Sequence, residues 1–297
     1  MVSVTSIVSA IAASALSSAA AAGSVIAPVR GRQPSSLAPR PIHYNIGAPV
    51  VTDPIKVHLI YYGDWTASQK SLVETFIKGI GASKWWDVER KYYFQKSANA
   101  SKTYISNQVS LGSITTDDYS LGKSLEGDDL PNLIQSKIDA GALPEDTNAV
   151  YFVMTAGDVD ESGGSRSFCT DYCGYHSSTR SQSGKDLLYA MVGLPTACVA
   201  ACVPAINQNV SPNNDIGVDA VLSVVAHELA EAASDPMYDS RAWEDNVKDE
   251  NADKCAYNYG KTLRDANGAR YNMGWGGRNY LIQQNWDPVK QACALSA

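Results

Sequence analysis

The sequence has no basic patch. Its 24 Lys and Arg residues are scattered along the chain and are outnumbered by 31 Asp and Glu residues, which gives a formal net charge of -7. Nucleic-acid binding requires clustered positive charge that neutralises phosphates, so a nucleic-acid partner is disfavoured. Internal repeats, long heptad patterns and low-complexity tracts are also absent after residue 45, which argues against a repeat or coiled-coil architecture.

Charged side chains are missing from the first 22 residues, and this apolar stretch ends in the small residues Ala20–Ala22. The pattern predicts a signal peptide over residues 1–22 that is too short to remain as a membrane span. No second span follows, so we expect a secreted protein. Residues 23–45 contain Pro, Ser and Arg without an apolar period, which predicts a disordered leader or pro-segment before a single domain over residues 46–297.

The cysteine content fits an exported protein. An even number of cysteines in a secreted chain predicts three disulfides, although the sequence does not choose their pairing. The six residues are Cys169, Cys173, Cys198, Cys202, Cys255 and Cys293. A thiolate metal site is the less favoured alternative, because the C-x3-C pairs lack the tighter spacing of most zinc ribbons. Asn99 and Asn209 lie in N-x-S sequences and are predicted glycosylation acceptors in a eukaryotic host.

Apolar runs and helical periods predict an α/β (α+β) fold. Three apolar, β-branched and aromatic runs predict buried strands: 55–63, 148–157 and 185–194. Three amphipathic segments predict helices: 67–80, 83–94 and 125–143. The order of these elements favours a mixed, partly parallel sheet with flanking helices. The tail is loop-rich, with a hairpin predicted around Asn267 and Gly268.

The predicted helix over 83–94 is aromatic on one side. Trp85, Trp86, Tyr92 and Tyr93 would form a sugar-binding platform if they were exposed. Aromatic residues at helical spacing belong more often to the core, so carbohydrate binding is the third of three hypotheses.

The segment VVAHELAEAASDP, residues 224–236, carries the candidate chemistry. A helix is predicted over 218–233, because that stretch lacks Gly and Pro and Pro236 follows it. Helical spacing places His227 and Glu231 on one side, where their side chains can converge on one ion. The alternative is a surface helix with its polar side in water.

The motif HExxE resembles the HExxH of zinc peptidases. In those enzymes the Glu after the first ligand acts as general base on the metal-bound water, and Glu228 occupies that position. Glu231 would replace the second His, since zinc also binds carboxylate oxygen. The probable ion is Zn²⁺, while the acidic character of residues 244–253 leaves Mn²⁺ or Ca²⁺ as alternatives.

Further ligands must come from other segments. Glu250 and Asp253, in the acidic run, are the expected third ligands. Asp235 is an alternative that a helix stop explains equally well. His176 is an additional candidate, although we expect a structural role for it in a disulfide loop.

Several segments resemble the plant phosphate-induced protein 1 / EXORDIUM family of extracellular proteins. They lie between about residues 44 and 293 and include VHLIYYGDWTASQK, WWDVERKYY, FCTDYCGYH, NNDIGVDAVLSVVAHELAEAASDP and GRNYLIQQNWDPVKQAC. The resemblance implies a secreted cell-wall or apoplastic protein linked to growth responses, with no settled enzymatic activity. The matching helix of the plant proteins lacks the His and Glu pair, so this chain departs from them where chemistry would occur.

HELAEAASDP and ENADKC, residues 250–255, are instead similar to microbial secreted proteins regarded as zincin-like. This resemblance implies a zincin-like fold and assigns the metal to His227, Glu231 and an acidic third ligand. The first hypothesis is therefore a secreted zinc-dependent metallopeptidase that acts on an extracellular peptide or protein. The second is a non-catalytic EXORDIUM-type protein that contacts a cell-wall component. Catalysis requires an open coordination position, whereas protein ligands close a structural site.

Overall fold

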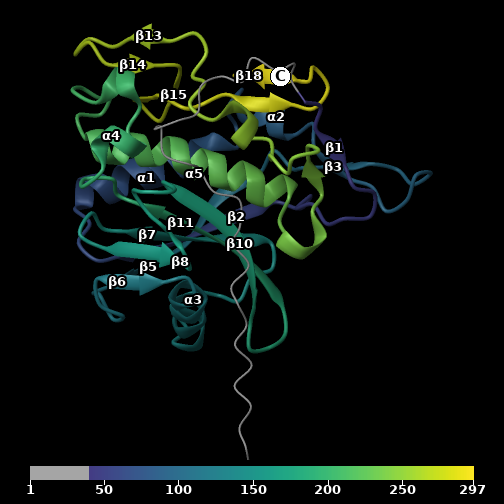
Figure 1. Cartoon of the computed structure of the whole chain (residues 1–297), viewed down its shortest axis with the longest axis horizontal. Helices are drawn as coiled ribbons and strands as arrows, with labels where there is room; N and C mark the ends of the chain where they lie inside the picture. Colours follow the sequence, from purple (N-terminus) through teal and green to yellow (C-terminus); the bar gives the residue numbers. More distant parts are fainter. Residues whose placement is uncertain (1–39) are drawn as a thin grey trace, which may run out of the picture.

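A mixed five-stranded sheet forms the centre of the computed structural model, which describes residues 40–297 (Figure 1). The strand order is β10-β11-β7-β2-β5. The strands are β2 (Ile55–Tyr62), β5 (Val109–Asp117), β7 (Ala149–Thr155), β10 (Gly174–Arg180) and β11 (Asp186–Gly193). Neighbouring strands are parallel except for β10, which is antiparallel to β11, so the predicted mixed sheet is confirmed.

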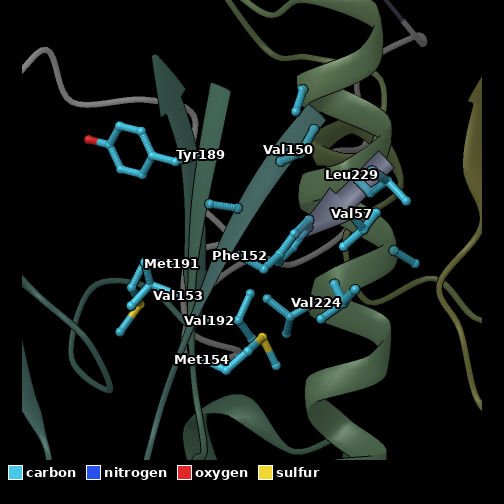
Figure 2. Close-up of a cluster of buried hydrophobic side chains, with 14 of the residues drawn as sticks. Val57, Val150, Phe152, Val153, Met154, Tyr189, Met191, Val192, Val224 and Leu229 are labelled. Atoms are coloured by element: carbon cyan, nitrogen blue, oxygen red, sulfur yellow. The ribbon is translucent and has the colours of Figure 1, made fainter. Parts of the chain in front are cut away.

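The two faces of the sheet follow from the alternation of side chains along each strand. Figure 2 shows Phe152 and Val192 facing helix α5 (Ile216–Ser234), while Val153 and Met191 lie on the opposite face. β7 is buried along its whole length, as its continuous apolar sequence requires. The edge strands β5 and β10 contain more polar residues, and the apolar runs did not predict them.

The helices cover both faces of the sheet (Figure 1). α1 (Ala67–Ile80) and α5 lie on one face, and α3 (Asp129–Asp139) lies on the other. The prediction for α1 is confirmed, because Thr66 forms a capping box with Gln69. α3 is shorter than predicted, since β6 (Ser124–Glu126) occupies the start of the expected segment. Within residues 40–297, the longest apolar stretch in any helix falls short of a membrane span.

Short strands and 3₁₀ turns of the C-terminal region cover the side of α5 that faces away from the sheet (Figure 1). These elements are η2 (Tyr238–Ser240), β12 (Trp243–Glu244), η3 (Asp253–Cys255), β13 (Leu263–Arg264), β14 (Arg270–Tyr271), β15 (Met273–Trp275), β16 (Arg278–Tyr280), β17 (Asn285–Asp287) and β18 (Ala292–Ala294). β13 and β14 form the predicted hairpin around Asn267 and Gly268. The remaining small elements are β1 (His43–Tyr44), β3 (Tyr93–Phe94), β4 (Thr103–Tyr104), β8 (Asp160–Gly163), β9 (Arg166–Ser167), α2 (Trp86–Glu89), α4 (Val199–Cys202) and η1 (Ala205–Asn207).

The domain includes residues that we assigned to the leader. β1 pairs with β12, and the guanidinium of Arg40 forms ion pairs with Asp245 at 2.9 Å and with Asp249 at 2.7 Å. The prediction of a disordered leader up to residue 45 is therefore wrong for residues 40–45. The predicted signal peptide and residues 23–39 lie outside the described residues.

The aromatic helix predicted over 83–94 is reduced to the single turn α2. Tyr93 and Phe94 pair instead with β4, because aromatic residues fit an extended strand well. Trp85 and Trp86 are completely buried, and their indole N–H groups donate to the carbonyls of Gln283 (2.7 Å) and Ser106 (2.9 Å). They belong to the core, and the sugar-platform hypothesis for this pair is wrong.

All six cysteines form disulfides, as predicted. Cys169 pairs with Cys198 and Cys173 with Cys202, which ties the segment before β10 to α4. Cys255 pairs with Cys293 and joins η3 to β18. The first two disulfides hold the segment before β10, and the third holds η3; both segments lie next to α5. Because all six cysteines are paired, the alternative of a thiolate metal site is excluded.

The burial of Trp86 generates a stability prediction. Trp86→Ala should lower the free energy of unfolding by about 3 to 5 kcal/mol, because it removes a fully buried side chain and leaves a cavity. Tyr104→Ala is the control and should change it by less than about 1 kcal/mol, since Tyr104 is 51% exposed. Urea denaturation measures both, and equal losses would contradict this assignment of the core.

Candidate metal centre

Helix α5 is buried on all sides, including its polar one. Asp215 caps it by accepting from the N–H of Val218 at 3.0 Å. His227, Glu228 and Glu231 have no exposed surface. The alternative of a surface helix with its polar side in water is therefore wrong, because the C-terminal elements cover that side.

Two parts of the C-terminal region, residues 250–253 and the segment around Gln283, cover the polar side of α5. The backbone N–H of Gln283 donates to Ser223 Oγ at 3.1 Å, and the Gln283 amide nitrogen lies 2.9 Å from His227 Nδ1. The N–H of Asp253 donates to Glu231 Oε1 at 3.0 Å. These contacts bring residues 250–253 and 283 against the polar side of α5, and they fix the side chains of His227 and Glu231.

The first group of candidate ligands surrounds His227. Its Nε2 lies 3.1 Å from Glu231 Oε1 and 3.6 Å from Asp253 Oδ1. His227, Glu228 and Glu231 form a group whose ligand atoms all lie within 4.8 Å of one another, and Asp253 lies beside this group. The spacing of His227 and Glu231 thus brings their side chains together, as the motif predicts.

The second group surrounds His176, which lies on β10. Its Nε2 is 3.4 Å from Glu250 Oε1 and 3.7 Å from Glu231 Oε2. His176 lies within the loop that the Cys173–Cys202 disulfide closes, as expected, but β10 begins directly after Cys173 and places the imidazole beside the carboxylates of Glu231 and Glu250. Gly174 makes this approach close, since a Cβ there would lie 2.6 Å from a methyl group of Val224.

Asp235 has a structural role at the end of α5. Its carboxylate accepts from the N–H of Ala242 at 2.5 Å and pairs with Arg241 at 3.3 Å. Arg241 also pairs with Glu250 at 2.9 Å. Asp235 therefore holds the arginine that orients Glu250, and no group of candidate ligand atoms contains it.

Several buried polar atoms of this cluster lack a hydrogen bond. They are both ring nitrogens of His176, Nε2 of His227, both carboxylate oxygens of Glu228 and Oε2 of Glu231. An unsatisfied buried polar atom costs free energy, and native structures contain few of them. A metal ion would bind Nε2 of a histidine and carboxylate oxygens among these atoms, and imidazole with carboxylate is a donor set that zinc accepts. The residues present therefore fit a zinc ion.

Burial and mutual repulsion perturb the acid–base equilibria of the cluster. Burial raises the pKa of Glu228 well above its usual value, and it raises the pKa of Glu231 to about 7 and that of Asp235 to about 8. Burial alone would lower the pKa of His227, but Glu231 and Asp253 raise it well above the usual value. Burial lowers the pKa of His176. Without a cation, the folded protein thus favours protonated carboxyl groups in this region.

Side-chain amides hold the acidic segment in place, and no local sequence pattern predicts them. Glu89 is buried and accepts from the side-chain amides of Asn251 (2.8 Å) and Asn285 (2.7 Å). Asn251 also donates to Ser234 Oγ at 2.9 Å. Because Asn251 lies next to Glu250, this network fixes the segment that provides Glu250 and Asp253. Gln283 and Asn285 lie within the family-like segment near the C-terminus, which was the only available hint.

The space around the cluster is small. A cavity of about 10 Å³ lies beside Ser223 and Gln283 and has room for about one water molecule. A larger pocket of about 510 Å³ is lined by Thr196 and Ala197 and by the Cys169–Cys198 disulfide, and contains no candidate ligand. The two predicted glycosylation acceptors, Asn99 and Asn209, are exposed in loops, so their modification remains a prediction.

Comparison with known proteins identifies relatives along almost the whole described chain. Residues 42–296 match the family model for the phosphate-induced protein 1 conserved region. Protein EXORDIUM-like 3 of Arabidopsis thaliana is 36% identical over 286 residues, covering 85% of this chain and 82% of the relative. Protein PHOSPHATE-INDUCED 1 of Nicotiana tabacum is 29% identical over 293 residues, covering 85% and 87%. No solved structure matches the chain, so the expected zincin-like fold has no support from a known structure.

The pKa shifts predict how the metal-free protein responds to pH. Raised folded-state pKa values for Glu231 and His227 mean that their contribution to stability is lost as pH rises. Between pH 6.5 and pH 8 the metal-free protein should lose about 1 kcal/mol from Glu231, with a further loss from His227 in the same direction. Below pH 6.5, His176 acts in the opposite sense, because its pKa is lowered.

Denaturation of the chelated protein across this pH range measures the effect. Glu231→Gln, which retains an oxygen for the Asp253 N–H, should reduce the dependence without abolishing it, because Asp235, whose pKa is raised to about 8, loses stability in the same direction. A metal-free wild type whose stability rises from pH 6.5 to pH 8 would contradict the assignment.

Proposed function

This chain belongs to the phosphate-induced protein 1 family, and we propose that it is a secreted, non-catalytic member whose buried cluster holds structural zinc. The proposed role is the EXORDIUM-type one, in growth or in interaction with a cell-wall component. The metal would add to the packing and hydrogen bonds that join β10, α5 and residues 250–253.

The complete burial of the ligands carries this proposal. A hydrolytic zinc site keeps one coordination position open for water and substrate, whereas a structural site is closed by protein. His227, Glu231 and Glu250 have no exposed surface, and His176 is 3% exposed. A peptide bond cannot reach such a cluster without displacement of the C-terminal cover.

The donor chemistry supports zinc. Two imidazoles together with carboxylates suit zinc, whereas calcium prefers oxygen ligands alone. When bound, zinc would act as a cross-link that neutralises buried carboxylates. The carboxyl groups and imidazoles of this chain would hold it, and Asp253 and Gln283 would orient Glu231 and His227.

Two observations support an extracellular location. The relatives are EXORDIUM-type and phosphate-induced proteins, and all six cysteines are oxidised. Disulfides persist in oxidising compartments and are rare in the cytosol of most organisms.

Zinc-dependent peptide hydrolysis is the second candidate, and one observation favours it. Glu228 occupies the position of the general base in the motif, and neither of its carboxylate oxygens has a hydrogen-bond partner. In that reading, the carboxylate of Glu228 would accept a proton from an attacking water. The matched relatives reported above are not named as peptidases.

The structural role predicts a dependence of stability on metal. Chelation of the purified secreted protein should lower the midpoint of thermal unfolding by roughly 5 to 10 °C, because a bound ligand stabilises only the folded state. Readdition of zinc should restore it. His227→Ala should show a smaller response to zinc than the wild type, whereas Glu126→Gln, a substitution at an exposed residue, should keep the full response. Elemental analysis showing no metal in the wild type, after exposure to zinc, manganese and calcium, would refute the proposal.

The absence of catalysis is tested separately with a peptide library. Zinc-loaded wild type and Glu228→Gln should both leave the library uncleaved, because the cluster is closed. Cleavage by the wild type that disappears in Glu228→Gln, with zinc content unchanged, would establish the hydrolase instead.

A further inference from the structure

The two oxygens of Glu231 face different histidines. Oε1 lies 3.1 Å from Nε2 of His227, and Oε2 lies 3.7 Å from Nε2 of His176. The candidate ligand atoms correspondingly form two groups, and Glu231 is the residue that both contain. This is the arrangement of a carboxylate that bridges two cations.

Each group has distances suited to one ion. Two donors at about 2.0 to 2.1 Å from a tetrahedral zinc ion lie about 3.4 Å apart. At the first position, Nε2 of His227 is 3.1 Å from Glu231 Oε1, and Asp253 Oδ1 lies beside the group, 3.6 Å from the same nitrogen. In the second group, Nε2 of His176 is 3.4 Å from Glu250 Oε1 and 3.7 Å from Glu231 Oε2.

Buried atoms aimed into each position provide an observation independent of the acidic residues. Nε2 of His227 and Nε2 of His176 both lack a hydrogen bond, and both side chains are at least nine-tenths buried. Glu231 Oε2 is likewise without a partner, whereas Oε1 is fixed by the N–H of Asp253 at 3.0 Å. The bridging residue is therefore held in place before any ion binds.

We propose that the cluster is a carboxylate-bridged dinuclear site for divalent ions of the zinc type. His227, Asp253 and one oxygen of Glu231 hold the first ion, with Glu228 beside it. His176, Glu250 and the other oxygen of Glu231 hold the second. The inference rests on the proposed function, namely that this cluster binds structural metal.

The test is metal stoichiometry, which requires no catalytic activity. Metal-free full-length protein is loaded with zinc, dialysed and measured by elemental analysis, with two zinc ions per chain expected. His176→Ala and His227→Ala should each retain one ion. His58→Gln, which changes a buried histidine of β2 outside the cluster, should retain two.

Cobalt(II) loading provides a second readout that depends on no substitution. Two cobalt ions bridged by Glu231 should be magnetically coupled, so the electron paramagnetic resonance signal of the fully loaded wild type should be weaker per ion than that of the half-loaded protein. Glu231→Gln should leave at most one ion per chain.

The outcomes separate the two proposals. A wild type that binds one zinc ion and shows no coupling with cobalt overturns the dinuclear site while leaving a structural metal in place. A wild type that binds none overturns both. Binding of two ions that survives in His176→Ala places the second ion elsewhere and also overturns the inference.

Discussion

The structure depends on the burial of a polar helix side. α5 lies between a β-sheet and the C-terminal cover, so its apolar side packs on strands while its other side packs on loops. Covering this polar side costs free energy unless the covering loop provides hydrogen-bonding or charged partners for His227, Glu228 and Glu231. Residues 250–253 and Gln283 supply some of those partners, and Asn251 and Asn285 anchor the supplying segment on Glu89. Nε2 of His227, Oε2 of Glu231 and both carboxylate oxygens of Glu228 still lack a hydrogen bond, which is the observation on which the proposed metal depends.

The same constraint explains the position of the disulfides. β10 must remain close to α5 for His176 to reach Glu231, and Cys173–Cys202 fixes the residue directly before this strand. η3 must remain against α5 for Asp253 to reach His227, and Cys255–Cys293 fixes its end. These two disulfides therefore hold the strand that carries His176 and the turn that carries Asp253 against α5. They do so against the electrostatic repulsion between the carboxylates of the cluster.

Local signals were sufficient for much of the fold. α1 was predicted with its observed ends, because Thr66 and Gln69 form a cap that involves only neighbouring residues. β2, β7 and β11 were predicted because buried strands need continuous apolar sequence. β5 and β10 were missed, since edge strands tolerate polar residues. The helix over 83–94 was wrong, because Tyr93 and Phe94 found pairing partners in β4 that the local pattern does not contain.

The residues of the candidate site also fall into those that local sequence signals predict and those that they do not. The pairing of His227 with Glu231 follows from helical spacing, and the acidic run pointed to Glu250 and Asp253. The placement of His176 could not be predicted, because it depends on the pairing of β10 with β11 and on the bare backbone at Gly174. The burial of the polar side of α5 was missed as well, because the segments that cover it are distant along the chain. Gln283, which contacts Ser223, lies 60 residues after it.

The pairing of β1 with β12 limits where the N-terminal region can be trimmed. Arg40 neutralises Asp245 and Asp249, which lie just before the segment that carries Glu250. Cleavage after Tyr44 would remove both the strand and the arginine, and would release the acidic loop. Trimming that leaves residues 40–44 in place keeps these contacts, whereas trimming beyond them would disturb the ligand cluster.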